Sequence, residues 1–324
     1  MRDLRISLVA NGNAGRATRR AGLARVIGSI LSRPPNPHRV YDTRTLAELS
    51  AAAQQIQRDA PDILAIAGGD GTVHRTLTAV LTRREHSEHP PPPILIVPTG
   101  TMNLVATALG ITRRDPVAFV QRVTEKVRRG EPLDVVHARP LEVSGTYGFL
   151  YGAALPVHLL QRYYAGGTVR GPVRALRVVL EALLDELLGL LPLRASHQLL
   201  TAPVRAAIRL PAGHAPPVIA SDAYSGIMVG AIDSVGVGCR ALPRAMESLD
   251  AFMVRATQLS FWGLCGNIIQ LFGGQSLPRT FDAAVASCEI VYDAPTVTTI
   301  DGELRAPTLR DTIACGPLLS FITG

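Results

Sequence analysis

Three glycines and an aspartate directly follow a short apolar segment in the N-terminal half of the chain. Residues 63–67 read Ile-Leu-Ala-Ile-Ala, a run typical of a strand buried on both faces of a parallel sheet. The run continues into Gly68-Gly69-Asp70-Gly71-Thr72, and a helix is expected from there to about Leu81. Glycines between a buried strand and a helix let the backbone turn sharply and leave N–H groups uncovered. The segment therefore predicts a phosphate-binding loop, with a plain tight turn as the alternative.

Two further segments have the same order of strand, turn and helix. Residues 5–10 are expected to form a strand that runs into Asn11-Gly12-Asn13-Ala14-Gly15 and a helix at about 16–32. Residues 94–97 form another expected strand, followed by Gly100-Thr101-Met102-Asn103 and a helix. Because ligands of open α/β sheets collect at the carboxyl ends of the strands, we expect all three turns to lie at one ligand-binding edge. Taken singly, the second and third turns are ordinary in composition.

The remaining pattern divides the chain into two domains. Residues 39–41 are expected to form a strand and residues 44–58 a helix with Thr43 as its N-cap. Residues 1–134 are therefore predicted to form a doubly wound α/β nucleotide-binding domain. Residues 135–305 are predicted to form a β-rich, mostly antiparallel, sandwich-like domain, from which residues 306–324 return to the first. The expected elements of the second domain are a helix at 174–191 and strands at 204–210, 224–231, 284–292 and 296–300.

Arginine supplies almost all of the positive charge, a bias typical of GC-rich bacterial genomes. The formal net charge is +7, yet the chain has a single lysine, Lys126. Lys126 lies in an expected amphipathic helix, which excludes kinases whose phosphate-binding lysine lies in a Walker A loop or on a strand. Basic excess is typical of proteins that bind nucleic acid, anionic membranes or phosphates. No run of basic residues contains interleaved Tyr or Phe, so we expect no nucleic-acid partner.

The sequence predicts no membrane span, signal peptide or zinc site. The longest apolar region, residues 178–191, contains acidic residues and is shorter than the roughly 20 residues of a spanning helix. Residues 1–10 are too charged and too short for a signal peptide, which favours a cytoplasmic protein. The cysteines include no C-x-x-C pair and are interpreted as buried thiols. They are Cys239, Cys265, Cys288 and Cys315.

Two shorter motifs lie in the second domain. Asp301-Gly302-Glu303 offers carboxylates that could accept a proton from an attacking hydroxyl, and its alternative interpretation is a hairpin turn. Residues 236–241 read Gly-Val-Gly-Cys-Arg-Ala and match a dinucleotide-binding pattern. We exclude that site because Pro243 would fall inside the helix that the pattern must open.

Three of these motifs together resemble the diacylglycerol kinase catalytic-domain family. They are Gly68-Gly69-Asp70-Gly71-Thr72-Val73, Gly100-Thr101-Met102-Asn103 and Asp301-Gly302-Glu303, in this order and spacing. The family includes bacterial diacylglycerol and phosphatidylglycerol kinases and the sphingosine and ceramide kinases. NAD kinases and phosphofructokinases share the first motif, whereas the combination is specific. The resemblance covers nearly the whole chain. It implies ATP and Mg²⁺ bound in a cleft between two domains, and phosphoryl transfer to a lipid hydroxyl.

The resemblance also implies roles for individual residues. Glu303 is the expected general base, with Asp301 beside it, and Asp70 is expected to orient the metal or the nucleotide. Magnesium is expected to bridge the ATP phosphates. The expected nucleotide-binding residues are Asn11, Gly15 and Thr43, then Gly68, Gly69, Asp70, Gly71, Thr72 and Val73 of the phosphate loop, and Thr101 and Asn103 of the second loop.

The chain departs from the family pattern at several positions. His74 and Arg75 stand where Asn-Glu is frequent, and Leu104 replaces an acid after the second loop. We interpret His74 as a helix-surface residue, and Arg75 as lying on a solvated helix face or meeting a phosphate. The family's D-D-G metal segment is replaced by Glu-Ser-Leu-Asp. Glu247 and Asp250 are therefore the candidate ligands of a structural magnesium.

A lipid acceptor predicts that the protein works at a membrane surface. Residues 159–164 and the helix at 174–191 are apolar, and basic residues flank them at Arg162, Arg170, Arg174 and Arg177. Such an apolar surface with basic flanks could bind the inner face of an anionic membrane. The protein would then be a cytoplasmic, peripheral membrane protein. Packing of the helix on the sheet is the alternative. The resemblance also allows a homodimer.

Two other functions are compatible with the sequence. The departures at Arg75, Leu104 and 247–250 would suit a lipid- or nucleotide-binding regulator without catalytic activity. A soluble NAD kinase-like enzyme would share the first motif, although no second motif of that family is present. Formation of NADP from NAD and ATP would identify the soluble kinase. Nucleotide binding without turnover of any lipid would identify the regulator.

Overall fold

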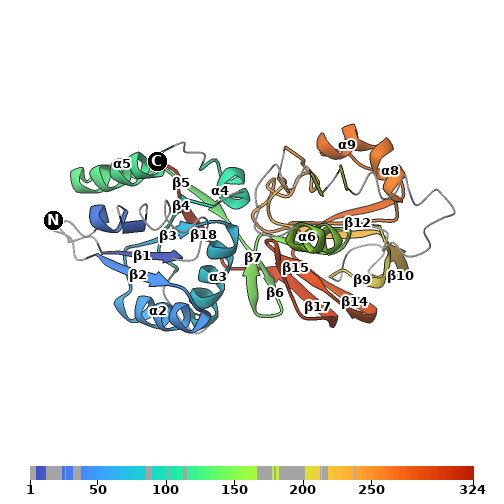
Figure 1. Cartoon of the computed structure of the whole chain (residues 1–324), viewed down its shortest axis with the longest axis horizontal. Coiled ribbons are helices and arrows are strands. Elements are labelled where there is room, and N and C mark those ends of the chain that lie inside the picture. The colour runs from blue at the N-terminus through green and yellow to red at the C-terminus, as the bar shows by residue number, and fades with distance from the viewer. Residues whose placement is uncertain are drawn as a thin grey trace. The chain divides into compact units, whose positions relative to one another are not determined.

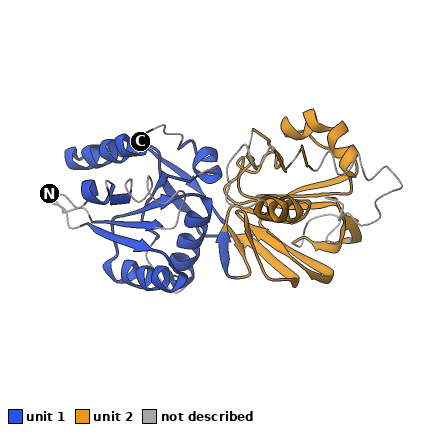
Figure 2. Ribbon diagram, in the orientation of Figure 1, with its two compact units in different colours: residues 1–140, 145–147, 316–324 blue, residues 141–144, 148–315 orange. Residues whose placement is uncertain are grey.

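The chain forms two units, each with its own β-sheet structure (Figure 2). Unit 1 consists of residues 1–140, 145–147 and 316–324, and unit 2 of residues 141–144 and 148–315. The first segment of unit 1 thus ends beyond the expected boundary at residue 134. The computed structural model describes residues 5–11, 24–25, 27–31, 38–84, 90–100, 103–111, 115–165, 177–178, 180–181, 201–211, 213, 218–236 and 238–324.

Unit 1 contains a six-stranded sheet with the strand order β2-β1-β3-β4-β18-β5. Neighbouring strands are parallel from β2 to β18, whereas the edge strand β5 is antiparallel to β18. β1 and β3 are apolar and almost wholly buried, as expected for strands with helices on both faces. The strands are β1 (Ile6–Asn11), β2 (Arg39–Thr43), β3 (Ile63–Gly68), β4 (Ile94–Pro98), β5 (Val135–Ala138) and β18 (Leu319–Ile322).

Helices cover both faces of this sheet, with α2 on one side and α5 on the other (Figure 1). α3 ends at Leu81 as predicted, and Lys126 lies in the amphipathic helix α5. Residues 24, 25 and 27–31 of the expected helix at 16–32 are helical. The predicted doubly wound α/β fold is thereby confirmed. The helices are α2 (Leu46–Asp59), α3 (Asp70–Leu81), α4 (Leu104–Ala108) and α5 (Pro116–Arg129), with the 3₁₀ turn η1 at Thr82–Arg84.

The N-cap of α2 is Thr45 and not the predicted Thr43. The Thr45 hydroxyl accepts a hydrogen bond from the Glu48 N–H, and the Glu48 carboxylate accepts one from the Thr45 N–H, both at 3.1 Å. This reciprocal capping box fixes the start of the helix. Thr43 instead ends β2, where it pairs with Asn11 and donates its hydroxyl to the Ala10 carbonyl at 3.2 Å. Strand pairing therefore holds Thr43 out of the helix.

Unit 2 contains two antiparallel sheets, which confirms the predicted β-rich, sandwich-like domain. One sheet has the strand order β10-β9-β14-β17-β6-β7 and the other β13-β12-β11-β8-β15-β16. The strands are β6 (Leu141–Val143), β7 (Thr146–Gly148), β8 (Leu150–Ala154), β9 (Val204–Arg209), β10 (Val218–Tyr224), β11 (Gly226–Gly230), β12 (Phe252–Thr257), β13 (Thr280–Val285), β14 (Ser287–Thr296), β15 (Thr298–Ile300), β16 (Glu303–Leu304) and β17 (Thr308–Cys315). Of β7, only Gly148 belongs to unit 2. The helices are α6 (Leu155–Ala165), α8 (Phe261–Gly266) and α9 (Ile268–Phe272).

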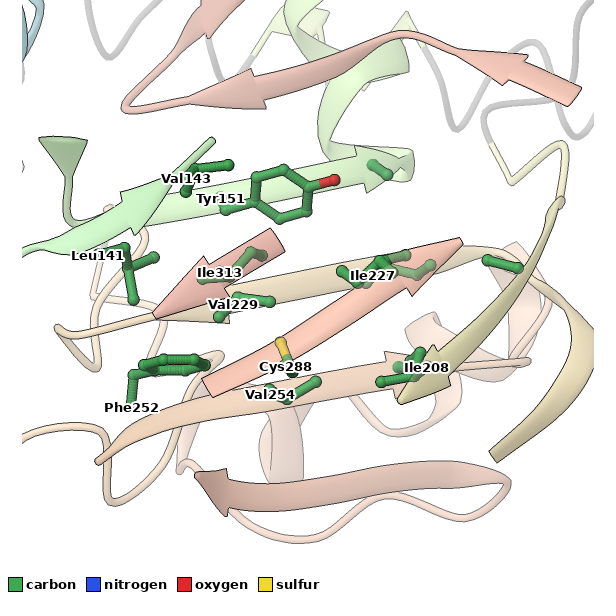
Figure 3. Close-up of a cluster of buried hydrophobic side chains, with 14 of the residues drawn as sticks. Leu141, Val143, Tyr151, Ile208, Ile227, Val229, Phe252, Val254, Cys288 and Ile313 are labelled. Atoms are coloured by element: carbon green, nitrogen blue, oxygen red, sulfur yellow. The ribbon is translucent and has the colours of Figure 1, made fainter. Parts of the chain in front are cut away.

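The two sheets of unit 2 share one apolar core (Figure 3). Ile208 and Ile313 enter it from the first sheet, and Ile227 and Val254 from the second. All four side chains are fully buried. Because each face is apolar, burial of this layer is what holds the two sheets together.

A buried polar network crosses the same core. The Tyr151 hydroxyl lies 2.6 Å from the Tyr292 hydroxyl and donates to the Asp311 carboxylate at 2.8 Å. Arg305 pairs with the same carboxylate at 2.7 Å. Burial raises the pKa of both tyrosines. Since Asp311 is only 1% exposed, these partners supply the hydrogen bonds that water would otherwise provide.

Several boundaries in unit 2 differ from those expected. Residues 224–231 and 284–292 each contain a break, at Ser225 between β10 and β11 and at Ala286 between β13 and β14. The Ser225 hydroxyl donates to the carbonyls of Thr257 and Leu259, which fixes the first break. The sequence pattern did not indicate β12. Of residues 306–324, β17 lies in unit 2 and residues 316–324 lie in unit 1. Most of the expected helix at 174–191 lies outside the described residues.

The four cysteines are free thiols, of which Cys239 and Cys288 are buried. Cys265 and Cys315 are half-buried. Burial raises the pKa of Cys288 to about 12. The interpretation as buried thiols is thus confirmed for two of the four. In the part of the chain that the structure describes, no helix is both long enough and apolar enough to cross a membrane.

Candidate active site

The carboxyl ends of four neighbouring strands in unit 1 bring the predicted turns to one edge. In the parallel register Asn11 pairs with Thr43, and Gly68 pairs with Pro98. β3 lies directly beside β1, with Ala67 opposite Ala10. The three segments that the sequence singled out therefore meet at the sheet edge where open α/β sheets bind ligands.

The glycine-rich segment turns from strand to helix within one residue. Gly68 ends β3, Gly69 is the N-cap of α3, and Asp70 is already helical. The Gly69 carbonyl accepts hydrogen bonds from Thr72 N–H at 2.9 Å and Val73 N–H at 3.0 Å. No side chain of the described residues caps the N-terminus of α3 by a hydrogen bond. Its backbone N–H groups and helix dipole can therefore face an anion, as predicted for a phosphate loop.

Close approach, and not an unusual backbone angle, explains the glycines. A β-carbon on Gly68 would lie 2.3 Å from the Thr72 β-carbon. A β-carbon on Gly100 would lie 2.3 Å from the Gly69 α-carbon and 2.5 Å from Asn103 Oδ1. The phosphate loop and the second loop thus touch through backbone atoms at Gly69 and Gly100. Larger residues would separate the loops.

Asp70 ties the two loops together. Its carboxylate accepts a hydrogen bond from the Val105 N–H at 3.0 Å, so it caps the N-terminus of α4. Burial raises the pKa of Asp70, while hydrogen bonds from the Leu104, Val105 and Asn103 backbone lower it, and burial prevails. In this structure the carboxylate holds the second loop in place.

The second loop is described from Asn103 onward, because Thr101 lies outside the described residues. Asn103 adopts a left-handed backbone with φ 50° and is the N-cap of α4. Its Nδ2 donates to the Gly100 carbonyl at 3.0 Å, and its buried Oδ1 has no hydrogen-bond partner among the described residues. An unsatisfied acceptor at this edge is suited to a donor from a ligand.

A pocket opens beside the phosphate loop in unit 1. Asn11 Nδ2 donates to Thr72 Oγ1 there at 3.4 Å. Thr76 also lines the pocket, and its buried hydroxyl has no hydrogen-bond partner among the described residues. The lining consists of Asn11, Thr43, Arg44, Thr45, Leu46, Leu49, Thr72, Arg75 and Thr76. The lining contains two arginines, several hydroxyls and no carboxylate, although Arg44 pairs with Asp42 at 3.4 Å. Such a lining suits an anionic, hydroxyl-bearing ligand.

Arg44 and Thr76 were not anticipated from the sequence, and Arg75 was left with two interpretations. Arg75 is exposed on α3, which agrees with its interpretation as a helix-face residue, and it also lines this pocket. Its contact with a phosphate stays a prediction. Arg44 lies between β2 and α2 and could have been suggested only by its position after a strand. Gly15, the other expected member of the first turn, lies outside the described residues.

His74 is buried, which corrects its interpretation as a helix-surface residue. Only 7% of it is exposed, and its Nδ1 lies 2.7 Å from the Tyr147 carbonyl. Thr78 makes a hydrogen bond to each backbone group of Tyr147, at 3.2 and 3.0 Å. Residues 145–147 belong to unit 1. Their contact with His74 and Thr78 buries a side of α3 that the helix pattern alone assigned to solvent.

In unit 2, the segment from Asp301 to Glu303 forms a hairpin turn, which was its alternative interpretation. Asp301 and Gly302 have φ angles of 47° and 84°, as in the type I′ turn that joins two antiparallel strands. The Asp301 carboxylate accepts hydrogen bonds from the backbone N–H groups of Phe149 and Leu150 at 3.0 and 2.8 Å. Its role in the structure is therefore to anchor the hairpin.

Glu303 starts β16 on the far side of this turn. The Thr299 hydroxyl donates to its carbonyl at 3.0 Å, and the Tyr164 hydroxyl donates to the Gly302 carbonyl at 2.8 Å. Arg305 follows and connects the hairpin to the buried Asp311. The hairpin thus holds Glu303 on a fixed backbone, with its side chain half-buried.

The candidate metal ligands do not form a recognisable cluster. Glu247 pairs with Arg244 at 2.8 Å, and the Asp250 N–H donates to the Ser248 hydroxyl at 3.1 Å. Among the described residues, no three His, Cys, Asp or Glu side chains gather where they could hold a metal ion. The assignment of Glu247 and Asp250 to magnesium stays a prediction.

Unit 1 is thus an α/β domain whose sheet edge carries the N-terminus of α3 and two touching glycine loops, an arrangement suited to anionic ligands. Residues 5–138 match the family model of the diacylglycerol kinase catalytic domain. This part of the chain is therefore similar to the diacylglycerol kinase catalytic domain. Asp301 and Glu303 lie outside the matched residues.

One known protein is similar to part of the chain in sequence, and solved structures are similar to it in fold. The chain is 32% identical over 80 residues to the mitochondrial acylglycerol kinase of Xenopus laevis, a match that spans 24% of this chain and 19% of that protein. A crystal structure of a diacylglycerol kinase from Bacillus anthracis strain Sterne superposes with a TM-score of 0.63 at 15% identity, over 99% of this chain and 97% of that one. A second structure from this strain, whose kinase assignment is provisional, gives a TM-score of 0.67 at 16% identity over the same shares. At these identities the structures establish the shared fold.

Proposed function

We propose that the protein is an ATP- and Mg²⁺-dependent lipid kinase that phosphorylates a hydroxyl of diacylglycerol or a related lipid. The observation that carries the proposal is the contact of Gly69 with Gly100, because it joins the two loops of the family motif at the N-terminus of α3. The family match of residues 5–138 and the similarity to an acylglycerol kinase support a lipid as acceptor.

In this proposal the nucleotide binds at the carboxyl edge of the unit 1 sheet. The N-terminus of α3, at Gly69 and Asp70, holds a phosphate through its backbone N–H groups. Arg44 and Arg75 line the adjacent pocket and supply positive charge to the rest of the polyphosphate. Mg²⁺, when bound, neutralises the charge that develops on the β- and γ-phosphates.

Glu303 is proposed to accept the proton of the lipid hydroxyl. As the hydroxyl oxygen bonds to the γ-phosphorus, the bond from that phosphorus to the β–γ bridging oxygen breaks and ADP leaves. The hydroxyl proton passes to the Glu303 carboxylate. The Asp301 carboxylate is already held by two backbone N–H groups, which makes Glu303 the better base of the two.

The test is the steady-state kinetics of Glu303→Gln in mixed micelles that contain the lipid and Mg-ATP. We expect kcat to fall by roughly 10²–10⁴-fold, since that is the usual contribution of a general base, with the Kd for ATP unchanged. Glu142→Gln is the matched control, because Glu142 is a half-buried glutamate on β6 of the same unit, and it should behave like the wild type. A variant at position 303 with full turnover would refute the assigned base.

The regulator remains the second candidate, and the departures at Arg75 and Leu104 are the observation that favours it. Isothermal titration with ATP separates the two functions. Tight nucleotide binding without phosphoryl transfer to any lipid would replace the kinase by the regulator.

A further inference from the structure

Two short helices of unit 2 present an apolar surface to solvent. α8 and α9 lie next to each other at the rim of unit 2 (Figure 1). Trp262, Ile268, Ile269 and Phe272 are 41, 46, 80 and 41% exposed, and we call these four residues the α8–α9 patch. The stretch 260–277 contains no charged residue. Apolar side chains gathered in this way on a surface usually mark an interaction site.

Other residues of the same segment hold the helices on unit 2. Phe261 packs against Leu155 and Leu159 of α6. Leu264 packs in a second cluster of buried leucines. The Ser260 hydroxyl caps α8 by accepting the Gly263 N–H at 3.2 Å. Because these inward residues anchor the helices, the exposed members of the patch are not needed for the fold.

Exposed arginines lie at both ends of the patch. Arg279 is exposed, and its carbonyl accepts the N–H of Gln258, just before α8. The Arg240 N–H donates to the Phe272 carbonyl, which places Arg240 beside the end of α9, and its side chain pairs with Asp233 at 2.7 Å. Apolar side chains bordered by arginine are the arrangement by which short helices bind anionic membrane surfaces.

We propose that the α8–α9 patch docks the protein on a bilayer that contains anionic lipids. α8 and α9 have six and five residues, so they can lie only within the interface and not across it. Tryptophan prefers the boundary between headgroups and acyl chains, and Ile269 would reach deeper because it is the most exposed of the four. The choice of a bilayer as partner rests on the proposed lipid acceptor. The surface differs from the one expected at residues 159–164 and 174–191.

Trp262 is the chain's only tryptophan, so its fluorescence reports directly on the patch. The wild-type protein is titrated, without nucleotide, with vesicles of phosphatidylcholine and with vesicles that also contain phosphatidylglycerol. We expect a blue shift with the anionic vesicles, quenching by brominated acyl chains, and weaker binding at high salt. An emission spectrum that neither vesicle changes would overturn the proposal.

Two variants test which surface binds. Ile269→Asp combined with Phe272→Asp should lower the partition onto anionic vesicles at least about tenfold, since each removes a large apolar side chain from the lipid boundary. Leu309→Asp is the matched control: Leu309 is 53% exposed on β17, and its replacement should leave binding unchanged. Equal binding of the double variant and the wild type would contradict the inference, as would self-association that covers Trp262 without vesicles.

Activity on a short-chain diacylglycerol in solution separates this inference from the proposed function. If the double variant phosphorylates the soluble lipid normally but loses activity on vesicles, the docking proposal is supported. Vesicle binding through the patch without phosphorylation of any lipid would support docking and contradict the kinase. Turnover on vesicles that is unaffected in the double variant would contradict docking and leave the kinase intact.

Discussion

At the residue scale, Gly69 and Gly100 are important because their missing side chains let the two loops approach each other closely. Neither is among the glycines with positive φ, so another residue could adopt their backbone angles. A side chain at position 100, however, would meet the backbone of Gly69 at 2.3 Å, and a backbone cannot rotate away as a side chain can. The sequence suggested a sharp turn here, whereas the contact between two loops thirty residues apart could be seen only in the fold.

Gly100→Ala should therefore separate the two loops. We expect it to lower the free energy of unfolding by about 1–3 kcal/mol and to weaken ATP binding, because overpacking forces the backbone apart. Urea unfolding and calorimetric titration measure the two effects. The control is Gly28→Ala, whose β-carbon would meet only Val40 side-chain atoms at 3.4 Å and beyond, and which should be neutral or slightly stabilising. Equal behaviour of the two variants would contradict the packing role of Gly100.

Asp70 predicts a pH dependence of stability. Burial raises its pKa above the ordinary value of 3.8, so the folded state binds this proton more tightly than the unfolded chain does. Its contribution to stability is therefore fully present below pH 3.8 and is lost as the pH rises through the folded pKa. Relative to Asp70→Asn, the wild type should become less stable across this window and then level off. Urea unfolding at several pH values measures this difference. If the stability of the wild type relative to Asp70→Asn rose with pH, the pKa of Asp70 would be lowered and not raised.

At the scale of elements, the hairpin of β15 and β16 depends on one carboxylate. The Asp301 carboxylate accepts hydrogen bonds from the backbone N–H groups of Phe149 and Leu150, at the start of β8. Asp301→Ala should cost about 1–3 kcal/mol of stability, because it removes the charged acceptor of both hydrogen bonds. Asp301→Asn keeps an acceptor oxygen and should cost less. Thermal unfolding measures both.

Asp293→Ala is the control for the hairpin variants. Asp293 pairs with Arg205 on the surface of the same unit, with both side chains about half exposed, and such pairs contribute about 0–1 kcal/mol. If Asp301→Ala were no more harmful than Asp293→Ala, the carboxylate would not anchor the hairpin.

Elements with a strong local pattern could be predicted from the sequence, and those fixed by distant partners could not. β3 could be predicted from an all-apolar run that ends in glycine, and α3 from the helical spacing that follows it. The N-cap of α2 was misplaced because the pairing of Thr43 with Asn11 is not visible locally. His74 was assigned to the surface because its partner Tyr147 lies 73 residues further on.

The same distinction applies to the site. The glycine loops and the Asp-Gly-Glu hairpin were found as motifs, because their chemistry requires particular residues in sequence. Arg44 and Thr76 line the pocket through the packing of α2 and α3, and no motif contains them. Gly15 and Thr101 remain predictions, since they lie outside the described residues.

At the scale of the whole molecule, the proposal assigns nucleotide binding to unit 1 and the general base to unit 2. The family match covers residues 5–138, and the candidate base belongs to unit 2. Nucleotide binding should therefore depend on unit 1 residues such as Gly100, whereas Glu303 should affect turnover alone. The basic excess of +7 and the α8–α9 patch suit an enzyme whose acceptor is embedded in an anionic surface.

The most direct measurement is the fate of the γ-phosphate. Purified protein is incubated with γ-labelled ATP, Mg²⁺ and a panel of lipid hydroxyl acceptors in mixed micelles, and the label is partitioned between organic and aqueous phases. A lipid kinase transfers label to one lipid class in the organic phase, and Glu303→Gln abolishes this transfer while Glu142→Gln does not. Label that remains in ATP with every acceptor, although the protein binds ATP, would contradict the proposed function.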